Sequence, residues 1–202
     1  MAIRSRFFCL AWLLIATPLA QTAAVEPVRI AFTARVQNVY DPIDALQDAI
    51  QVGDLVQGSF TYDPATPDAD PRPGVGRYEH RRSPYGVSVA VGGLYFETDP
   101  EAVDVSITIA NDEGTPPRDR YLLESHRNLR LSNGASVSRI SWQLDDETRQ
   151  ALDDENLPTA PPDLATWQSA FGLTLEGGET VSYIIRAHIL EIRWCRGAAA
   201  CF

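Results

Sequence analysis

Apolar and polar residues alternate with a period of two along most of the chain. In residues 27–40, for example, the apolar positions on one side are Val28, Ile30, Phe32, Ala34 and Val36. Such alternation, rich in β-branched and aromatic residues, predicts a strand with one buried face. The same pattern predicts strands at residues 55–62, 76–82, 85–91, 94–98, 102–110, 121–125, 127–131, 138–144, 171–175 and 180–194.

Turn residues separate these runs, and no long helical pattern lies between them. Gly92-Gly93 joins two alternating runs and predicts a two-residue hairpin. Residues 163–167 have the pattern of a helical turn that buries Leu164 and Trp167, and residues 43–50 that of a helical turn or a loop. We therefore expect an all-β fold: an antiparallel β-sandwich or flattened barrel of about ten strands, with one or two short helical turns.

The most distinctive stretch runs from Val52 to His80. It begins as a strand with Phe60 and Tyr62 directed inward, and Gly58 predicts either a bulge or a close approach of the backbone. Asp63 and Pro64 end that strand and open a loop rich in proline and aspartate. A second strand follows, in which His80, flanked by charged residues, is expected on the solvated face.

The first 24 residues have the pattern of a secretory signal peptide. Two arginines precede an apolar run of about 10 residues, shorter than the roughly 20 that a membrane-spanning helix needs. We expect cleavage near Ala24, a single β domain over residues 25–194 and a tail over residues 195–202. The expected location is the periplasm or the exterior of the cell.

The formal net charge is −10, and every basic residue except histidine is arginine. An acidic surface repels phosphate, so nucleic acid is not an expected partner, nor is an anionic membrane after signal cleavage.

Cys195 and Cys201 are the two cysteines that remain after cleavage. An even pair in an oxidising compartment predicts a disulfide bond. Two free thiols, or a metal site completed by other ligands, are the alternatives.

Asp63, Asp68 and Asp70 are the best candidates for ligands of a metal ion. Three carboxylates within one loop suit a hard cation such as calcium. The loop lacks the glycine and the glutamate of an EF-hand, and a solvated acidic loop is the alternative.

No sequence motif of an enzyme was found, so no catalytic residue is predicted. A hydrolase with carboxylates brought together by the fold stays open as an alternative, since such pairs are spatial. Trp142, Trp167 and Trp194 are expected in the core, and a platform that stacks on sugar rings is the alternative.

Three motifs resemble a group of uncharacterised secreted bacterial β-sandwich proteins that often carry a PEP-CTERM sorting tail. They are a G-D-x-V-x-G-x-F-x-Y-D strand at Gly53–Asp63, V-x-V-G-G-x-x-F at Val89–Phe96, and L-P-x-x-P-P-x-L at Leu157–Leu164. The resemblance covers most of the chain after the signal peptide and implies no particular chemistry. The chain ends without the apolar helix of a sorting tail, which favours a soluble periplasmic or released protein.

Together these features predict an exported protein with a structural or binding role and no enzymatic activity. The alternatives are a carboxylate-dependent hydrolase and a calcium-dependent carbohydrate-binding or adhesive module. The sequence does not identify a partner; a carbohydrate and a protein are the two candidates.

Overall fold

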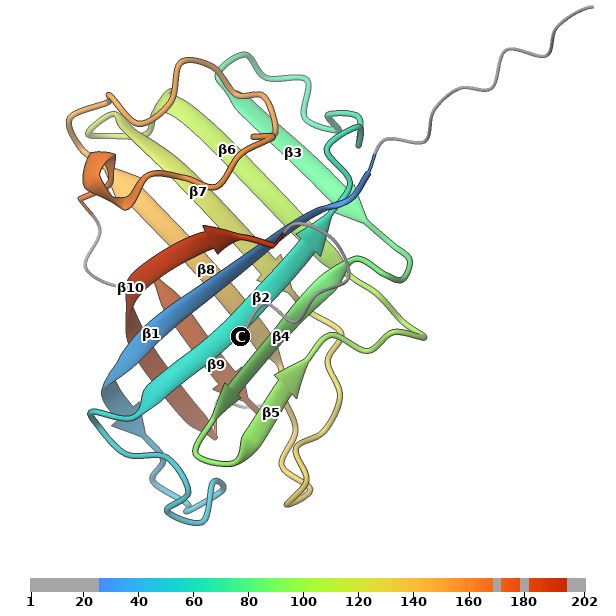
Figure 1. Ribbon diagram of the computed structural model, residues 1–202, viewed down its shortest axis with the longest axis vertical. Helices are drawn as coiled ribbons and strands as arrows, with labels where there is room; N and C mark the ends of the chain where they lie inside the picture. Colours follow the sequence, from blue (N-terminus) through green and yellow to red (C-terminus); the bar gives the residue numbers. More distant parts are fainter. Residues whose placement is uncertain (1–25, 169–171, 179–181, 196–202) are drawn as a thin grey trace, which may run out of the picture.

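The computed structural model describes residues 26–168, 172–178 and 182–195. Its elements are β1 (Val28–Tyr40), β2 (Leu55–Tyr62), β3 (Val75–His80), β4 (Gly86–Val91), β5 (Leu94–Glu97), β6 (Val105–Glu113), β7 (Arg118–Ser125), β8 (Arg139–Asp146), the 3₁₀ turn η1 (Leu164–Thr166), β9 (Leu173–Gly177) and β10 (Tyr183–Trp194) (Figure 1). The all-β prediction is confirmed, and the helical turn expected at residues 163–167 is η1.

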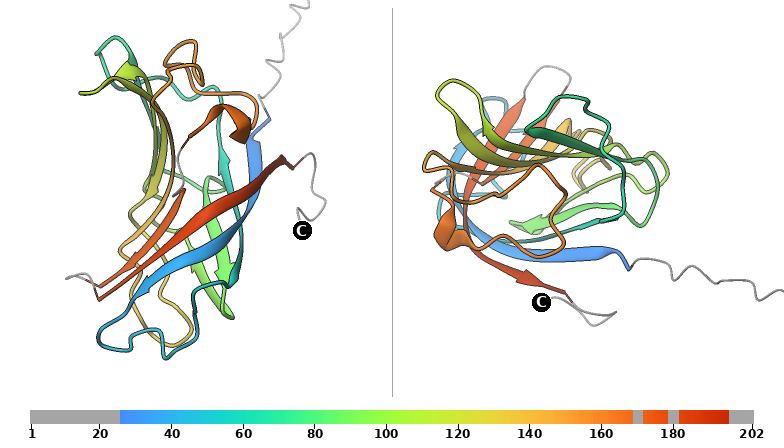
Figure 2. Two further views of the ribbon diagram at one scale, coloured as in Figure 1. Left: turned by 90° about the vertical axis from the view of Figure 1, so that its left-hand side faces the viewer. Right: turned by 90° about the horizontal axis from the view of Figure 1, so that it is seen from above.

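All ten strands form one antiparallel sheet in the order β3-β6-β7-β8-β9-β10-β1-β2-β4-β5. The sheet curls into a half-barrel, so that β3, β6 and β7 face β1, β2 and β4 (Figure 2). β3 follows β2 in the chain but pairs with β6 at the far edge. Because β3 pairs at the far edge, β2 pairs directly with β4.

Aromatic side chains fill the inner, concave face of the sheet. Phe60 lies at their centre, with ring centroids 5.3 Å from Trp142 and 6.4 Å from both Phe32 and Tyr121. All four side chains are fully buried. At Gly58 a Cβ atom would overlap the Phe32 ring, and the β1–β2 register runs on without a shift. Gly58 therefore marks a close approach and not a bulge.

The loop between β2 and β3 covers the outer edge of β3. Asp68 Oδ1 accepts a hydrogen bond from the Arg77 amide at 2.8 Å, and the Ala69 amide donates to the Arg77 carbonyl at 2.8 Å. Unpaired edge groups invite association with other strands. The proline- and aspartate-rich loop thus has a structural role at this edge.

The strand predicted at residues 127–131 is not formed. Asn128 instead makes an isolated bridge with Thr98, and the Leu129 amide donates to the Glu97 carbonyl at 2.9 Å. Residues 127–131 pair with the end of β5 at too few positions to form a strand, but they shield that edge.

Residues 147–168, which we call the strap, cross the open end of the half-barrel (orange in Figure 1). The Tyr62 hydroxyl donates to the Pro158 carbonyl at 2.5 Å, and Tyr78 donates to the Glu155 carbonyl at 2.8 Å. Trp167 is buried at the end of the strap. These contacts hold the strap against the inner face of the sheet.

Candidate functional site

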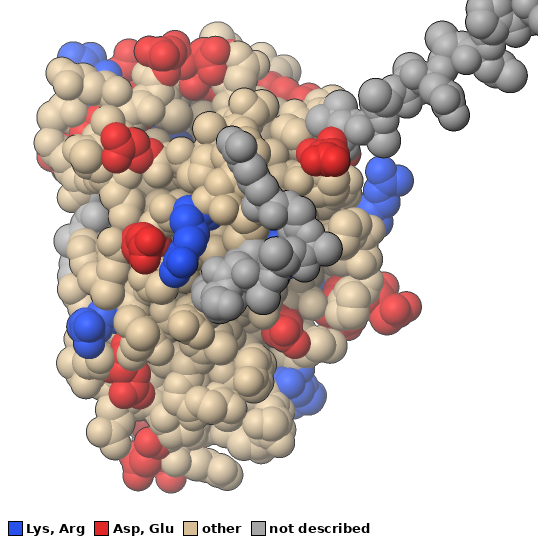
Figure 3. All heavy atoms as spheres, in the orientation of Figure 1, with Lys and Arg blue, Asp and Glu red and all other residues tan. Residues whose placement is uncertain are grey.

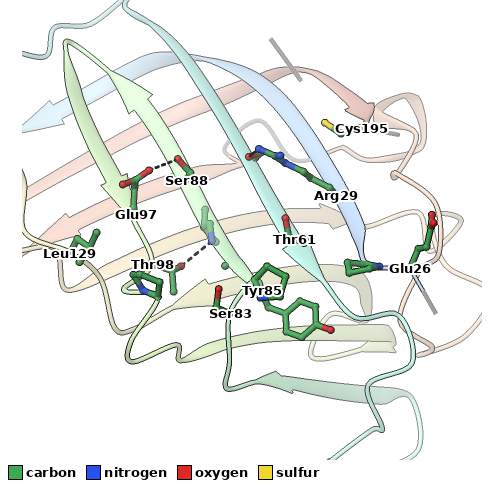
Figure 4. A pocket seen from close by; sticks show the side chains of 16 residues that line it. Glu26, Arg29, Thr61, Ser83, Tyr85, Ser88, Glu97, Thr98, Leu129 and Cys195 are labelled. Atoms are coloured by element: carbon green, nitrogen blue, oxygen red, sulfur yellow. Dashed lines mark hydrogen bonds between the residues drawn. The ribbon is translucent and has the colours of Figure 1, made fainter. Parts of the chain in front are cut away.

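A groove of about 710 Å³ lies on the outer, convex face of the sheet (Figure 4). We call it the outer groove. Its polar lining comes mainly from four adjacent strands, β1, β2, β4 and β5, and the side chains used below are Arg29, Ser59, Thr61, Tyr85, Ser88 and Glu97. Proline rings and Leu129 supply apolar patches on its walls.

Strand alternation explains why these polar side chains face outward. Ser59 and Thr61 alternate along β2 with the buried aromatics Phe60 and Tyr62. The register places Ser59 opposite Ser88, and Ser88 opposite Glu97. A polar row therefore crosses the outer face from β2 to β5.

Arg29 and Glu97 lie at opposite ends of this row (Figure 4). Arg29 Nη2 donates to Ser59 Oγ at 3.3 Å, and Ser88 Oγ donates to Glu97 Oε1 at 3.0 Å. Adjacent strands are about 4.8 Å apart, so the backbones of β1 and β5 are separated by roughly 14 Å. Within the described residues neither charged group forms an ion pair, which leaves most of the guanidinium donors open to a ligand.

Tyr85 forms a wall between the outer groove and a smaller pocket of about 340 Å³ around His80. Its hydroxyl donates to Asp63 Oδ2 at 3.1 Å, and its ring lies 5.2 Å from the His80 ring. Burial, followed by the hydrogen bond and charge of Asp63, raises the pKa of Tyr85. The phenol therefore stays neutral and keeps its fixed orientation.

The expectation that His80 is solvated is wrong, since its side chain is only 2% exposed. His80 Nε2 accepts the Asp63 amide proton at 3.1 Å and lies 3.0 Å from Thr66 Oγ1. Burial lowers the pKa of His80, which favours the neutral imidazole. His80 thus joins the end of β2 to the end of β3.

The three aspartates predicted to bind calcium serve separate hydrogen bonds. Asp63 accepts from the Ala65 amide and the Tyr85 hydroxyl, and Asp68 accepts from the Asp70 and Arg77 amides. Asp70 pairs with Arg72 at 2.6 Å, and this contact lowers the pKa of Asp70 to about 2.

Within the described ranges no three His, Cys, Asp or Glu side chains are placed to hold a metal ion. The geometry gives the calcium hypothesis no support, and it stays a prediction.

The three tryptophans do not form a sugar-stacking platform. Trp142 is fully buried and Trp167 is 8% exposed, as expected for core residues. Trp194, at the end of β10, is 37% exposed, so the expectation that it lies in the core is wrong. A stacking surface made of all three is therefore not present.

The arrangement that a carboxylate-dependent hydrolase needs is not evident around the aspartates of the strap. Asp153, Asp154 and Asp163 line a pocket beside Trp167, but all three are exposed. Asp154 and Asp163 accept hydrogen bonds from backbone amides of their own segment. A glycosidase acid is normally buried to raise its pKa, which these side chains are not.

Several predicted features lie outside the described residues. They are the signal peptide over residues 1–24, Cys201 and the rest of the tail after Cys195. Cys195 lines the outer groove. The disulfide between Cys195 and Cys201 stays a prediction.

Comparisons of this chain with protein-family models, curated proteins and solved structures found no match. The resemblance to secreted proteins with sorting tails therefore stays a prediction that rests on the motifs alone. In the described part of the chain, no helix has the length and apolar character needed to cross a membrane.

The outer groove was missed by the sequence analysis, although one signal for it was present. Ser59, Thr61 and Ser88 are small hydroxyl residues at the outward positions of two predicted strands. Their convergence with Arg29 and Glu97 depends on the strand order, which the spacing along the chain does not reveal.

Proposed function

We propose that this chain is a non-enzymatic binding module whose outer groove takes a neutral oligosaccharide. The observation that carries the proposal is the polar row from Arg29 through Ser59 and Ser88 to Glu97 that lines this groove. Sugar hydroxyls both donate and accept hydrogen bonds. A guanidinium offers only donors and a carboxylate only acceptors, so the two ends of the row suit the two roles of a hydroxyl.

The charges around the groove favour a neutral ligand over an anion. Arg29 alone would suit a carboxylate or a phosphate, but Glu26 and Glu97 line the same groove. The whole chain also carries a formal charge of −10, which repels anions at longer range. Tyr85 and the proline rings supply apolar surface for the carbon faces of sugar rings.

The experiment is a calorimetric titration with a panel of neutral oligosaccharides, including β-1,4- and α-1,4-linked glucose and β-1,4-linked N-acetylglucosamine. We expect at least one member to bind. Arg29→Ala and Glu97→Gln should each weaken binding about tenfold, because the first leaves ligand hydroxyls without a donor and the second replaces a charged acceptor with a neutral one.

Two variants serve as matched controls. Arg186→Ala removes an exposed arginine of β10, and Glu191→Gln changes an exposed glutamate of the same strand; neither lines the outer groove. Both should bind the ligand like the unmodified protein. The proposal is wrong if no member of the panel binds, or if Arg29→Ala and Glu97→Gln bind as tightly as their controls.

A further inference from the structure

Tyr85 lies between two hollows of the molecule (Figure 4). Among the described residues it is the one that lines both the outer groove and the smaller pocket of about 340 Å³ around His80. Its side chain is half-buried, so part of its surface is packed against the protein and part is open. The smaller pocket can therefore influence the outer groove through this side chain.

Asp63 holds the hydroxyl end of Tyr85. The Tyr85 hydroxyl donates to Asp63 Oδ2 at 3.1 Å, and Asp63 Oδ1 accepts the Ala65 amide at 2.9 Å. The Asp63 amide in turn donates to Nε2 of the buried His80 at 3.1 Å. Both carboxylate oxygens and the backbone of Asp63 thus have defined partners. The acceptor of the Tyr85 hydroxyl is fixed in place by the end of β2.

Two further contacts restrict Tyr85. Its ring meets the His80 ring edge to face, with centroids 5.2 Å apart and an interplanar angle of 68°. Its amide donates to the Arg82 carbonyl at 3.2 Å, which closes a turn before β4. The Arg82 side chain also reaches the hydroxyl, but it belongs to the same turn. Asp63 is the partner that ties this turn to a different strand.

The orientation of an aromatic side chain matters in a groove with little charge. Figure 3 looks onto β10, β1, β2 and β4, and most of the visible surface there is uncharged, with charged side chains scattered over it. A neutral sugar gains little from long-range attraction at such a surface. A ring that already has its bound orientation loses less conformational freedom when a ligand binds. The anchor of Tyr85 should therefore contribute to affinity.

We propose that Asp63, which does not line the outer groove, is a positioning residue for ligand binding there and acts through Tyr85. This inference rests on the proposed function, since it requires that the outer groove binds an oligosaccharide. It gives the end of β2 and the smaller pocket the role of a support for one wall of the groove.

The first test is a calorimetric titration with the tightest-binding member of the oligosaccharide panel. Asp63→Ala should weaken binding about threefold to tenfold, the effect of one lost hydrogen bond. Asp63→Asn keeps a hydrogen-bonding group beside the Tyr85 hydroxyl and should stay within about twofold of the unmodified protein. Asp154→Ala is the matched control: Asp154 also accepts the amide two residues further on, but it lies in the strap. This control should bind like the unmodified protein.

A double-mutant cycle then tests whether the effect passes through Tyr85. Tyr85→Phe keeps the ring and removes the hydroxyl, so it should weaken binding by the same threefold to tenfold, roughly, as Asp63→Ala. Adding Asp63→Ala to Tyr85→Phe should weaken binding by no more than about twofold further, because the hydrogen bond is already gone. A general disturbance of the loop would weaken binding by the same factor in both backgrounds.

Melting curves show that each variant is folded at the temperature of the titration. Unchanged affinity in folded Asp63→Ala or Tyr85→Phe overturns the inference and leaves the oligosaccharide proposal standing. The same holds for an equal loss in both backgrounds of the cycle, or for a loss in Asp63→Asn as large as in Asp63→Ala. If no member of the panel binds, the oligosaccharide proposal and this inference are both overturned.

Discussion

The outer groove and the region under the strap lie on opposite faces of one sheet and are built in different ways. On β2, Ser59 points outward and lines the outer groove, whereas its neighbour Phe60 points inward and belongs to the core. The pocket under the strap takes only Tyr121 from a strand and the rest of its lining from residues 151–167. Sheet register thus positions the outer groove, whereas hydrogen bonds between the strap and buried side chains position the strap.

The largest expected effect is a difference in stability loss between substitutions on the inner and the outer face of β2. Phe60→Ala removes a fully buried ring that contacts four other aromatic side chains, and it should lower the free energy of unfolding by about 3–5 kcal/mol. Ser59→Ala loses one hydrogen bond from Arg29 and should cost less than about 1 kcal/mol. Urea unfolding of both variants measures the difference, and equal losses would show that β2 does not divide core from groove.

A smaller loss of stability is expected when the strap is detached from the sheet. Asp119 accepts the amides of Asp112, Ala151 and Leu152, so Asp119→Ala leaves three donors without a partner. We expect a loss of about 2–3 kcal/mol, because hydrogen bonds to charged groups are the stronger kind. Hydrogen exchange should rise in the strap while β1, β2, β4 and β5 stay protected.

The same Asp119→Ala variant tests whether the outer groove is independent of the strap. The outer groove should keep its affinity for the oligosaccharide when the strap is loosened. If that affinity fell in a protein that is still folded, the strap and the outer groove would have to be treated as one unit.

The smallest effect concerns the loop that covers β3. Asp68→Ala removes the acceptor of the Arg77 amide and should cost about 1 kcal/mol, with more self-association at the uncovered edge. Asp70→Ala removes the ion pair with Arg72 and a hydrogen bond from the Arg72 amide, both within the loop itself, and is the matched control. Melting curves in calcium and in chelator test the calcium hypothesis: a rise with calcium that Asp68→Ala abolishes would support it, and curves that coincide would rule it out.

Period-two alternation predicted most of the strands because half-buried strands leave a strong pattern. It placed Phe60 and Tyr62 inward and predicted η1. It failed at residues 127–131, where pairing with the end of β5 is too brief for a strand. The charged residues beside His80 suggested a solvated position, and that prediction was wrong. Period-two alternation places His80 on the same face as Tyr78, and both side chains are buried.

The sites could not be predicted in the same way because they depend on non-local pairing. Arg29 and Glu97 share a groove only because β3 leaves its neighbours in sequence and pairs with β6. Tyr121 was correctly predicted to point inward, yet the pocket that it lines is closed by residues 151–167, and spacing along the chain does not reveal that contact. Alternation assigns a residue to a face, and the strand order decides which residues meet there.

The most direct test of the binding proposal is a map of amide chemical-shift changes on addition of the tightest-binding oligosaccharide of the panel. The account predicts that the largest changes fall on Arg29, Ser59, Ser88 and Glu97 and on their neighbours in β1, β2, β4 and β5. The amides of the strap should stay unchanged. Changes centred on the strap, or on the loop over residues 41–54, would contradict the assignment of the outer groove as the binding site.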